Sequence, residues 1–366
     1  SVQARNFVYA GGGSAGGATS LARAANPDLK WEEKAETNVG IEFDKGPLSI
    51  DFDIYSRNIT DFLIDRQVDV TEFGVDRRWE NAGAVTSKGW ELAVGYDVLD
   101  TGTMTYNTNL MLSSNEVTLD EYPLDLAQYG YLGSPGQNAV TMVRVKVGSP
   151  LGQIFAPVFT GVNPDGSPIF KDVNGDGNIN SDAGNVLQDD YDGEVIGSAY
   201  PDLELGWGNV ITFGDWTINA FFRGAFGHSL INTFRAFYEP NVPSQTSYNQ
   251  MNTNLREPSL GVAQYSSLYV EKADFFMLDN LTVSKRINFG ADKAIKDAIV
   301  SFNATRPFIS TSYTGTDPTP ELFDSLGGAE EGNIASGGAA LLAPGIDRRA
   351  DYFASKSVSL GLKLNF

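Results

Sequence analysis

The chain has no cysteine and a single histidine, His228, among its 366 residues. Disulfides, thiolate metal sites and cysteine nucleophiles are therefore excluded, and so is any site that needs two imidazoles. Basic residues are also scarce, because 26 Lys and Arg stand against 46 Asp and Glu, for a net charge of −20. Binding of phosphates needs clustered cations, so this balance argues against a nucleic-acid partner. The composition indicates no enzyme.

Long hydrophobic runs are missing as well. No stretch of about 18 or more apolar residues occurs, which excludes a transmembrane helix of ordinary length. Residues Ser1 to Ala10 lack the basic and apolar regions of a secretory signal. We expect the chain to start after a processing site or inside a longer protein.

What the sequence does contain is period-2 alternation. Val358, Leu360, Leu362, Leu364 and Phe366 share one parity, while the residues between them are small or polar. Alternate residues of a strand point to opposite faces, so one face of this strand is apolar. Helical periodicity is nearly absent. We count nine candidate strands, at 38–43, 48–55, 90–98, 104–113, 203–213, 216–226, 275–289, 300–308 and 357–366.

The connections between these strands alternate in length. Short links occur at Asp44-Lys45-Gly46, Leu99 to Gly102, Gly214-Asp215 and Gly290 to Asp297. Long segments occur at 61–87, 115–202, 227–272 and 313–354, all at the same end of the strands. Short turns at one end and long loops at the other are typical of outer-membrane barrels. Parity alone leaves a β-sandwich open, because there the apolar face would pack into a core instead of meeting lipid. The loop pattern favours an all-β, antiparallel transmembrane β-barrel with long extracellular loops.

Nine strands make an incomplete barrel. Bacterial single-chain barrels have even strand counts, and an open sheet would leave edges unpaired in lipid. We therefore expect residues 1–366 to be the C-terminal part of a barrel, with further strands before Ser1.

Several short segments, taken in order, resemble the SusC/RagA family of TonB-dependent outer-membrane transporters. They span most of the chain from Asn26 onward. They are Asn26-Pro27-Asp28-Leu29-Lys30-Trp31-Glu32, Asn38-Val39-Gly40-Ile41, Asn81 with Gly83 and Gly89, the run 170–177, Ile196-Gly197, Pro201-Asp202, Ala273-Asp274-Phe275, Asp279-Asn280-Leu281-Thr282, Gly315-Thr316-Asp317-Pro318, Gly345-Ile346-Asp347 and Phe366. The departures are Ser284-Lys285, where a Gly-Tyr pair is expected, and Thr319, where an acid is expected.

The resemblance implies a roughly 22-stranded barrel whose N-terminal plug, TonB-contacting segment and early strands are absent from this chain. It also implies a location in the bacterial outer membrane, in contact with its lipid. The implied partners are TonB, a SusD-like surface lipoprotein, and an oligosaccharide or oligopeptide that is imported. The implied protein is not an enzyme.

One loop has the spacing of a calcium site. Asp172, Asn174, Asp176 and Asn178 occupy alternate positions of a D-x-N-x-D-G loop, and Asp182 is the nearest acid to the closing position. Ca²⁺ takes about six to eight oxygen ligands, which such spacing can supply. The alternative is an Asx-rich turn held by its own hydrogen bonds, because the closing position that an EF-hand fills with a bidentate acid is Ala183.

Other polar and aromatic residues admit two interpretations each. Polar-parity residues would line the lumen, facing either substrate or plug; they are Asp51, Asp53, Arg57, Glu91, Asn107, Asn109, Asn219 and Arg223. Loop aromatics would stack on sugars, contact a lid, or simply pack on themselves; they are Tyr129, Tyr131, Tyr238, Tyr248 and Tyr265. His228 is expected to be structural.

Two functions from different classes follow. The first is TonB-dependent import across the outer membrane. The alternative is a secreted or surface β-sandwich, such as a glycan-binding adhesin, that binds without transport. A sandwich would bury its apolar parity in a dry interior, whereas a barrel would leave it on the outer wall.

Overall fold

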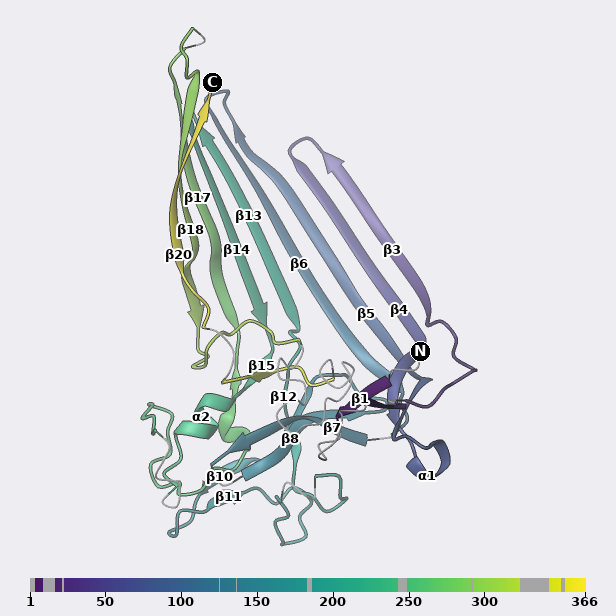
Figure 1. The fold of residues 1–366 in the computed structure, drawn as a ribbon. Helices are drawn as coiled ribbons and strands as arrows, with labels where there is room; N and C mark the ends of the chain where they lie inside the picture. Colours follow the sequence, from purple (N-terminus) through teal and green to yellow (C-terminus); the bar gives the residue numbers. More distant parts are fainter. Residues whose placement is uncertain are drawn as a thin grey trace.

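A tall antiparallel sheet dominates the structure, with shorter elements gathered at one of its ends (Figure 1). The computed structural model describes residues 4–8, 17–21, 23–124, 126–135, 137–182, 186–242, 249–290, 292–322, 342–349 and 353–366. Among these residues, no helix is both long and apolar enough to cross a membrane.

The tall sheet has nine strands in the order β20-β18-β17-β14-β13-β6-β5-β4-β3, with β20 and β3 at its edges. All its neighbouring pairs are antiparallel. The strands are β3 (Glu33–Lys45), β4 (Leu48–Gln67), β5 (Arg77–Asp100), β6 (Met104–Glu121), β13 (Leu203–Phe213), β14 (Trp216–Phe226), β17 (Phe275–Asn288), β18 (Asp297–Thr311) and β20 (Ser357–Asn365). These are the nine candidate strands of the sequence, most of them extended by several residues.

The short connections lie together at one end of this sheet, the turn end, as the sequence predicts (Figure 1). The β3–β4, β5–β6, β13–β14 and β17–β18 hairpins close there, and glycines with positive φ serve these turns: Gly46, Gly102, Gly214 and Gly290. Long connections meet at the opposite end, the loop end. The segregation of loop length that favoured a barrel is therefore present in the fold.

One of the four long loops was predicted wrongly. Residues 61–87 are mostly strand, because β4 runs on to Gln67 and β5 begins at Arg77, which leaves a connection of 68–76 with the short helix α1 (Val70–Phe73). Asp61 has φ 58°, and the β4–β5 register shifts on both sides of Phe62. Each shift exchanges the inner and outer parity, which is why the alternation disappears from the sequence although the strands continue.

The weak alternation of 275–308 has the same cause. The β17–β18 register shifts between Leu278 and Asn280, and Arg306 of β18 has φ 52°. Lys285, in contrast, does lie on the apolar face, opposite Trp216 and Val300.

The shorter elements form an assembly at the loop end. A four-stranded sheet in the order β12-β9-β8-β7 and a three-stranded sheet in the order β16-β15-β19 belong to it. A shared core joins the connections: Leu132, Met142 and Ile154 pack with Tyr265, Tyr269 and Ile346. The elements are β7 (Leu126–Ser134), β8 (Gln137–Lys146), β9 (Gln153–Ala156), β10 (Phe159–Val162), β11 (Pro168–Phe170), β12 (Glu194–Ser198), β15 (Ser229–Asn232), α2 (Thr233–Tyr238), η2 (Ser267–Tyr269), β16 (Val270–Lys272) and β19 (Ile346–Asp347), with β1 (Ala4–Val8) and β2 (Gly17–Leu21) forming a separate hairpin.

The apolar face of the tall sheet is exposed. Leu360 is 81% exposed, Ile41 64% and Val39 61%. In a sandwich these side chains would interleave with a second sheet, and within the described residues none of these three is covered in that way. The sheet therefore has the outer wall that a membrane barrel requires.

Candidate functional site

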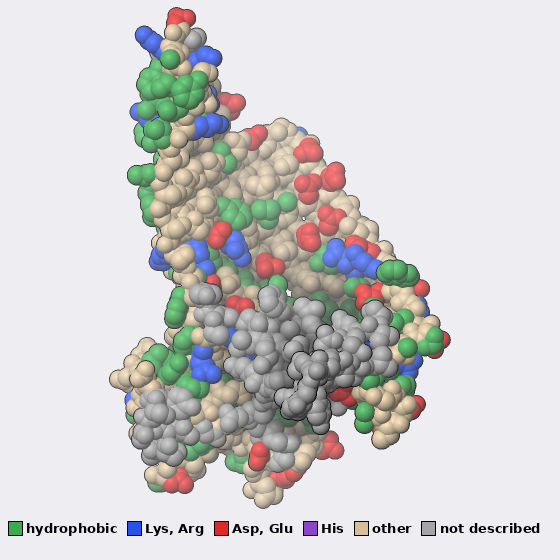
Figure 2. Space-filling view, viewed as in Figure 1, with side chains coloured by type: hydrophobic (Ala, Val, Ile, Leu, Met, Phe, Trp, Pro, Cys, Tyr) green, Lys and Arg blue, Asp and Glu red, His purple; other side chains and the backbone are tan. Residues whose placement is uncertain are grey.

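The polar face of the tall sheet is the first part of the candidate site. Strand register places Glu91 opposite both Asp53 and Ser113, and Ser113 opposite Glu204. The eight polar-parity residues predicted from the sequence share this face. Figure 2 shows acidic side chains gathered on it over the part of the sheet that contains β3, β4 and β5.

This face is hollowed. A depression of about 710 Å³ is lined by Asp51, Asp53, Glu91, Glu204 and Arg223, together with apolar residues of the neighbouring strands. A second depression of about 460 Å³ lies nearer the turn end, beside Asp97 and Asn107. The larger hollow carries four carboxylates and one guanidinium, so its surface is anionic.

The two cations predicted on this face are held by carboxylates. Arg57 pairs with Glu36 at 3.1 Å, and its guanidinium carbon lies 4.0 Å from the centre of the Tyr55 ring. Arg223 lies 3.8 Å from Asp279, the residue at the β17 register shift. Each cation therefore has a carboxylate within 4 Å on the inner wall.

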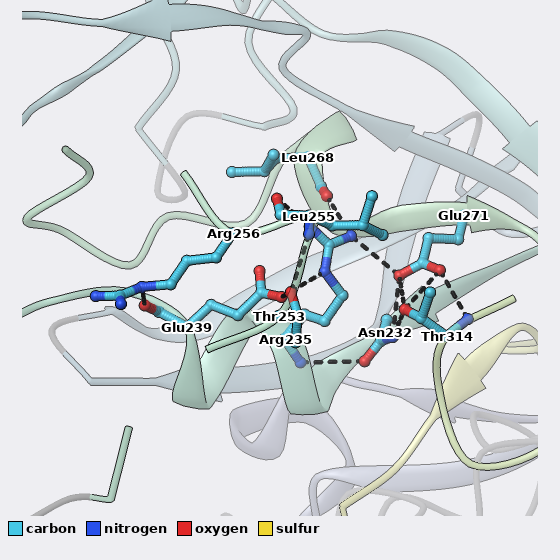
Figure 3. A network of polar contacts seen from close by, with 9 residues as sticks. All are labelled: Asn232, Arg235, Glu239, Thr253, Leu255, Arg256, Leu268, Glu271 and Thr314. Atoms are coloured by element: carbon cyan, nitrogen blue, oxygen red, sulfur yellow. Dashed lines mark hydrogen bonds and ion pairs between the residues drawn. The ribbon is translucent and has the colours of Figure 1, made fainter. Parts of the chain in front are cut away.

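A buried ionic network at the loop end is the second part. Arg235 of α2 donates from Nε to Glu239 at 2.9 Å and from one terminal nitrogen to Glu271 at 3.0 Å (Figure 3). It also donates to the backbone carbonyls of Leu268 and Leu255, at 3.0 and 3.2 Å. A single guanidinium thus ties α2 to the segments on both sides of η2.

Glu271 extends the network to a further connection. Its carboxylate accepts hydrogen bonds from the backbone N–H and the hydroxyl of Thr314, which lies between β18 and β19. Burial by itself would lower the pKa of Arg235, but hydrogen bonds and charge attraction from Glu239 and then Glu271 hold that pKa above its ordinary value. The Arg235 guanidinium is therefore charged, and each of its three nitrogens donates a hydrogen bond.

A second buried carboxylate, Asp347, organises the same connection. It accepts hydrogen bonds from the Tyr313 hydroxyl at 2.6 Å and from the backbone and hydroxyl of Thr316. Asp317 accepts two hydrogen bonds from Arg306, at 2.7 and 2.9 Å, and this guanidinium keeps the pKa of Asp317 low although burial favours the neutral acid. The Gly315 and Gly345 segments singled out in the sequence thus meet at one carboxylate.

Two other segments that carry the resemblance also meet. The amide of Asn81 in β5 donates to the carbonyl of Lys30 at 2.9 Å and accepts from its N–H at 3.0 Å. Asn81 also donates to the carbonyl of Asp61, and Lys30 pairs with the Asp61 carboxylate at 2.6 Å. These contacts fasten the segment before β3 across the irregular part of β4.

The predicted calcium loop is organised by its own hydrogen bonds. Asp172 accepts from the backbone N–H of Gly175 and Gly177, at 2.6 and 2.9 Å. Asn174 accepts from the N–H of Asp176, and Asp176 from that of Asn178. Asp182 is exposed, and in the described part of the chain no three His, Cys, Asp or Glu side chains are grouped so as to hold a metal ion.

A residue outside the predicted ligand set holds this loop. The buried Asp192 accepts from the backbone N–H of Val173 and Asn180, both at 2.7 Å. Burial favours its neutral form, yet these N–H donors keep its pKa below the ordinary value. The loop is therefore pinned near both ends, which is the arrangement of an Asx-rich turn, and the calcium site stays a prediction.

The loop aromatics that can be placed pack within the protein. Tyr265 is 2% exposed and donates to the carbonyl of Gly133. The hydroxyls of Tyr129 and Tyr122 lie 2.5 Å apart, and Tyr238 packs on Phe237. Tyr248 and the side chain of Tyr131 lie outside the part of the protein that the structure describes.

His228 is fully buried and structural in its contacts. Its Nε2 lies 2.7 Å from the carbonyl of Pro318, and its Nδ1 has no hydrogen-bond partner among the described residues. The ring meets Phe275 edge to face. Burial lowers the pKa of His228, so the neutral imidazole with a proton on Nε2 fits this position.

Comparisons with known proteins agree with this geometry. Residues 3–144 match the family model described as "TonB dependent receptor-like, beta-barrel". The chain is 25% identical to TonB-dependent receptor P26 of Formosa agariphila, over 95% of this chain and 36% of that protein. It is also 25% identical to TonB-dependent receptor SusC of Bacteroides thetaiotaomicron, over 82% of this chain and 31% of that protein.

The fold is also similar to that of a known transporter. The whole chain superposes on 38% of a chain in the structure of the RagAB peptide transporter, with a TM-score of 0.72 and 19% sequence identity. The chain is thus similar in sequence to TonB-dependent receptors, SusC among them, and similar in fold to part of a chain of the RagAB transporter. The SusC/RagA-like chain spans about a third of the length of the relatives it matches.

Three predictions are confirmed by this relationship. The SusC/RagA-like sheet is part of an antiparallel outer-membrane barrel, its location is the outer membrane, and its relatives are receptors and transporters, which are not enzymes. In such barrels the short turns are periplasmic and the long loops extracellular. The turn end is therefore periplasmic and the loop end extracellular.

Proposed function

We propose that the protein imports an oligopeptide or oligosaccharide across the outer membrane by a TonB-dependent route. The observation that carries the proposal is the division of the tall sheet into an exposed apolar outer face and a polar inner face with a hollow of about 710 Å³. A wall of this kind suits a polar solute that passes inside a barrel while the outside meets lipid.

Between an oligopeptide and an oligosaccharide, we favour an oligopeptide as the cargo. The structural likeness that covers the whole chain is to a protein described as a peptide transporter. The hollow also combines Asp51, Asp53 and Glu91 with Arg223. Such a set can hydrogen-bond and attract the amino and carboxylate groups of a short peptide.

The proposed partner at the loop end is a SusD-like surface lipoprotein that closes over the extracellular assembly. The Arg235 network and the shared core join three inter-strand connections into one body. A lipoprotein that closes over the barrel needs a rigid docking surface, and the joined connections provide one. TonB would supply the energy through parts of the barrel protein outside this chain.

The test is uptake by intact cells that carry or lack the gene. We expect a labelled peptide mixture to accumulate in the periplasm of the parent strain, and uptake to be lost on deletion of this gene or of TonB. Equal uptake in all three strains contradicts import. Uptake of oligosaccharides but not of peptides would keep import and overturn the cargo assignment.

A further inference from the structure

The periplasmic tip of the β17–β18 hairpin has a charge opposite to that of the protein. We define the basic tip as residues 285–290, 292–297 and 363–366. It contains five basic side chains and two acidic side chains, Asp292 and Asp297, on a chain whose net charge is −20. The cations are Lys285, Arg286, Lys293, Lys296 and Lys363. Figure 2 shows Lys and Arg side chains together with hydrophobic ones on the narrow projection beyond the sheet.

Most of these cations form no ion pair within the described part of the protein. Lys285, Arg286, Lys293 and Lys363 have no ion pair with any described carboxylate. Lys296 donates to the main-chain oxygen of Phe366 at 3.1 Å, which occupies one of its three N–H donors. Because the chain has far more acids than bases, cations left without a carboxylate at one place are available for an external anion.

The register places this tip beyond the neighbouring hairpin. Trp216, the first residue after the β13–β14 turn, lies opposite Lys285, and β17 then pairs with β18 for three more residues, to Asn288 opposite Asp297. Figure 1 shows the β17–β18 turn extending past the other turns. The ammonium of Lys285 lies 4.9 Å from the centre of the Trp216 ring. Trp and Lys at such a level are typical of a membrane–water interface.

Apolar side chains accompany the charges on the outer side. Ile287 and Leu364 are each 38% exposed, Phe289 48% and Phe366 74%. The outer face of the hairpin therefore continues the lipid-facing surface to the place where the cations begin. Apolar groups that dip into the acyl boundary, with cations beside them at headgroup level, are the composition of an interfacial anchor.

We propose that the basic tip binds the anionic phospholipid headgroups of the periplasmic leaflet. The ammonium groups of Lys285, Lys293 and Lys296 would bind the phosphates, and Phe289 and Phe366 would contact the acyl boundary. This inference depends on the placement of the barrel in the membrane and not on transport. The lipid experiment therefore tests it independently of the proposed cargo.

The experiment compares lipid selection by the natural outer-membrane protein and two triple variants. Each is reconstituted in phosphatidylcholine vesicles with a minority of phosphatidylglycerol and excised with a copolymer, and its bound lipids are measured by mass spectrometry. The test variant is Lys285→Gln, Lys293→Gln and Lys296→Gln, since Lys363 lies on the inner parity of β20. The control, Lys88→Gln, Lys146→Gln and Lys171→Gln, removes the same charge from outside the tip. Heat-modifiable gel mobility checks that every sample is folded.

Each cation near an anionic bilayer contributes roughly a fivefold preference, so three contribute about a hundredfold preference at low ionic strength. We expect phosphatidylglycerol to be enriched around the parent and the control, and the test variant to lose at least about tenfold of its preference. Enrichment that persists in the folded test variant overturns the proposal. A periplasmic protein that cross-links to the tip, with no phosphatidylglycerol enrichment in the parent, assigns the tip to that protein instead.

Discussion

The ring of Phe62 in β4 lies over the backbone of Gly83, its direct partner in β5. A Cβ built on Gly83 would collide with three carbons of that ring. Tyr55 has the same relationship with Gly89, where a Cβ would lie 2.6 Å from the Tyr55 hydroxyl oxygen. Gly83 and Gly89 therefore leave the space that the aromatic rings of Phe62 and Tyr55 occupy on the inner wall.

We expect Gly83→Ala to destabilise the folded barrel by about 1–3 kcal/mol, because the new methyl group would displace the ring of Phe62. The measurement is the urea midpoint for loss of heat-modifiable mobility. Gly208→Ala is the matched control, since its Cβ would meet Phe221 at an ordinary 3.8 Å. Adding Phe62→Leu to Gly83→Ala should restore part of the loss. Equal urea midpoints for Gly83→Ala and Gly208→Ala would contradict the close packing of Phe62 on Gly83.

Replacement of Arg235→Met should release two connections at once. It leaves Glu239 and Glu271 buried without their cation, a defect that costs about 3–5 kcal/mol in comparable buried pairs. Hydrogen exchange should rise both in 249–256 and around Thr314. Arg66→Met is the control, because its pair with Glu80 is exposed and contributes at most about 1 kcal/mol. Faster exchange confined to α2 would show that the connections are held independently.

Acid should loosen the contact between His228 and the carbonyl of Pro318. Burial lowers the pKa of His228 in the fold, so the unfolded chain binds the proton first and stability falls as pH drops below about 6.5. Asp274 and Glu204 oppose this shift and Lys272 supports it. In His228→Gln, whose amide can still donate to Pro318, the thermal midpoint should change less between pH 7 and 5. An unchanged slope contradicts the role of the imidazole.

The low pKa values of Asp192 and Asp317 act in a separate range. Both carboxylates are stabilised as anions in the fold, so their contribution is present at neutral pH and is lost only as pH falls below the ordinary Asp value of 3.8. Loss of stability near pH 6 therefore reports on His228 and not on these two acids.

Calcium binding by the 172–182 loop remains a prediction. Calorimetry on metal-free protein should detect Ca²⁺ with an affinity in about the 10⁻⁴ to 10⁻³ M range typical of extracellular modules. Asp176→Asn should weaken it, while Asp189→Asn, also an exposed acid of this connection, should not. The absence of heat at millimolar Ca²⁺ would leave the hydrogen bonds of Asp172 as the sole function of the loop.

The regular strands could be predicted because their inner and outer faces differ at every residue. The Leu360 to Phe366 strand is an example, as each of its side chains meets either lipid or the lumen. The path from Asp61 to Phe62 could not be predicted, since a backbone irregularity there exchanges the faces. Neither the β-propensity of the residues nor the period-2 alternation of the sequence indicates where such a shift occurs.

The polar inner face followed from the same parity, but the ionic network did not. Arg235 and Glu239 are four residues apart and could have been read as an exposed helical pair, while Glu271 and Thr314 are distant in sequence. The buried Asp192 likewise lies outside the D-x-N-x-D-G spacing. Partners brought together only by the loop assembly leave no pattern in one sequence.

The exposed apolar rows of the tall sheet face hydrocarbon, and the opposite rows face a wet lumen. Because this chain has no cysteine, single cysteines at Leu360 and Ser359 give clean sites for a nitroxide label. Electron paramagnetic resonance in outer membranes then compares collisions with oxygen, which dissolves in lipid, and with a water-soluble nickel complex. We expect the label at position 360 to collide mainly with oxygen and the label at position 359 mainly with nickel. Nickel dominance at both positions would contradict this arrangement.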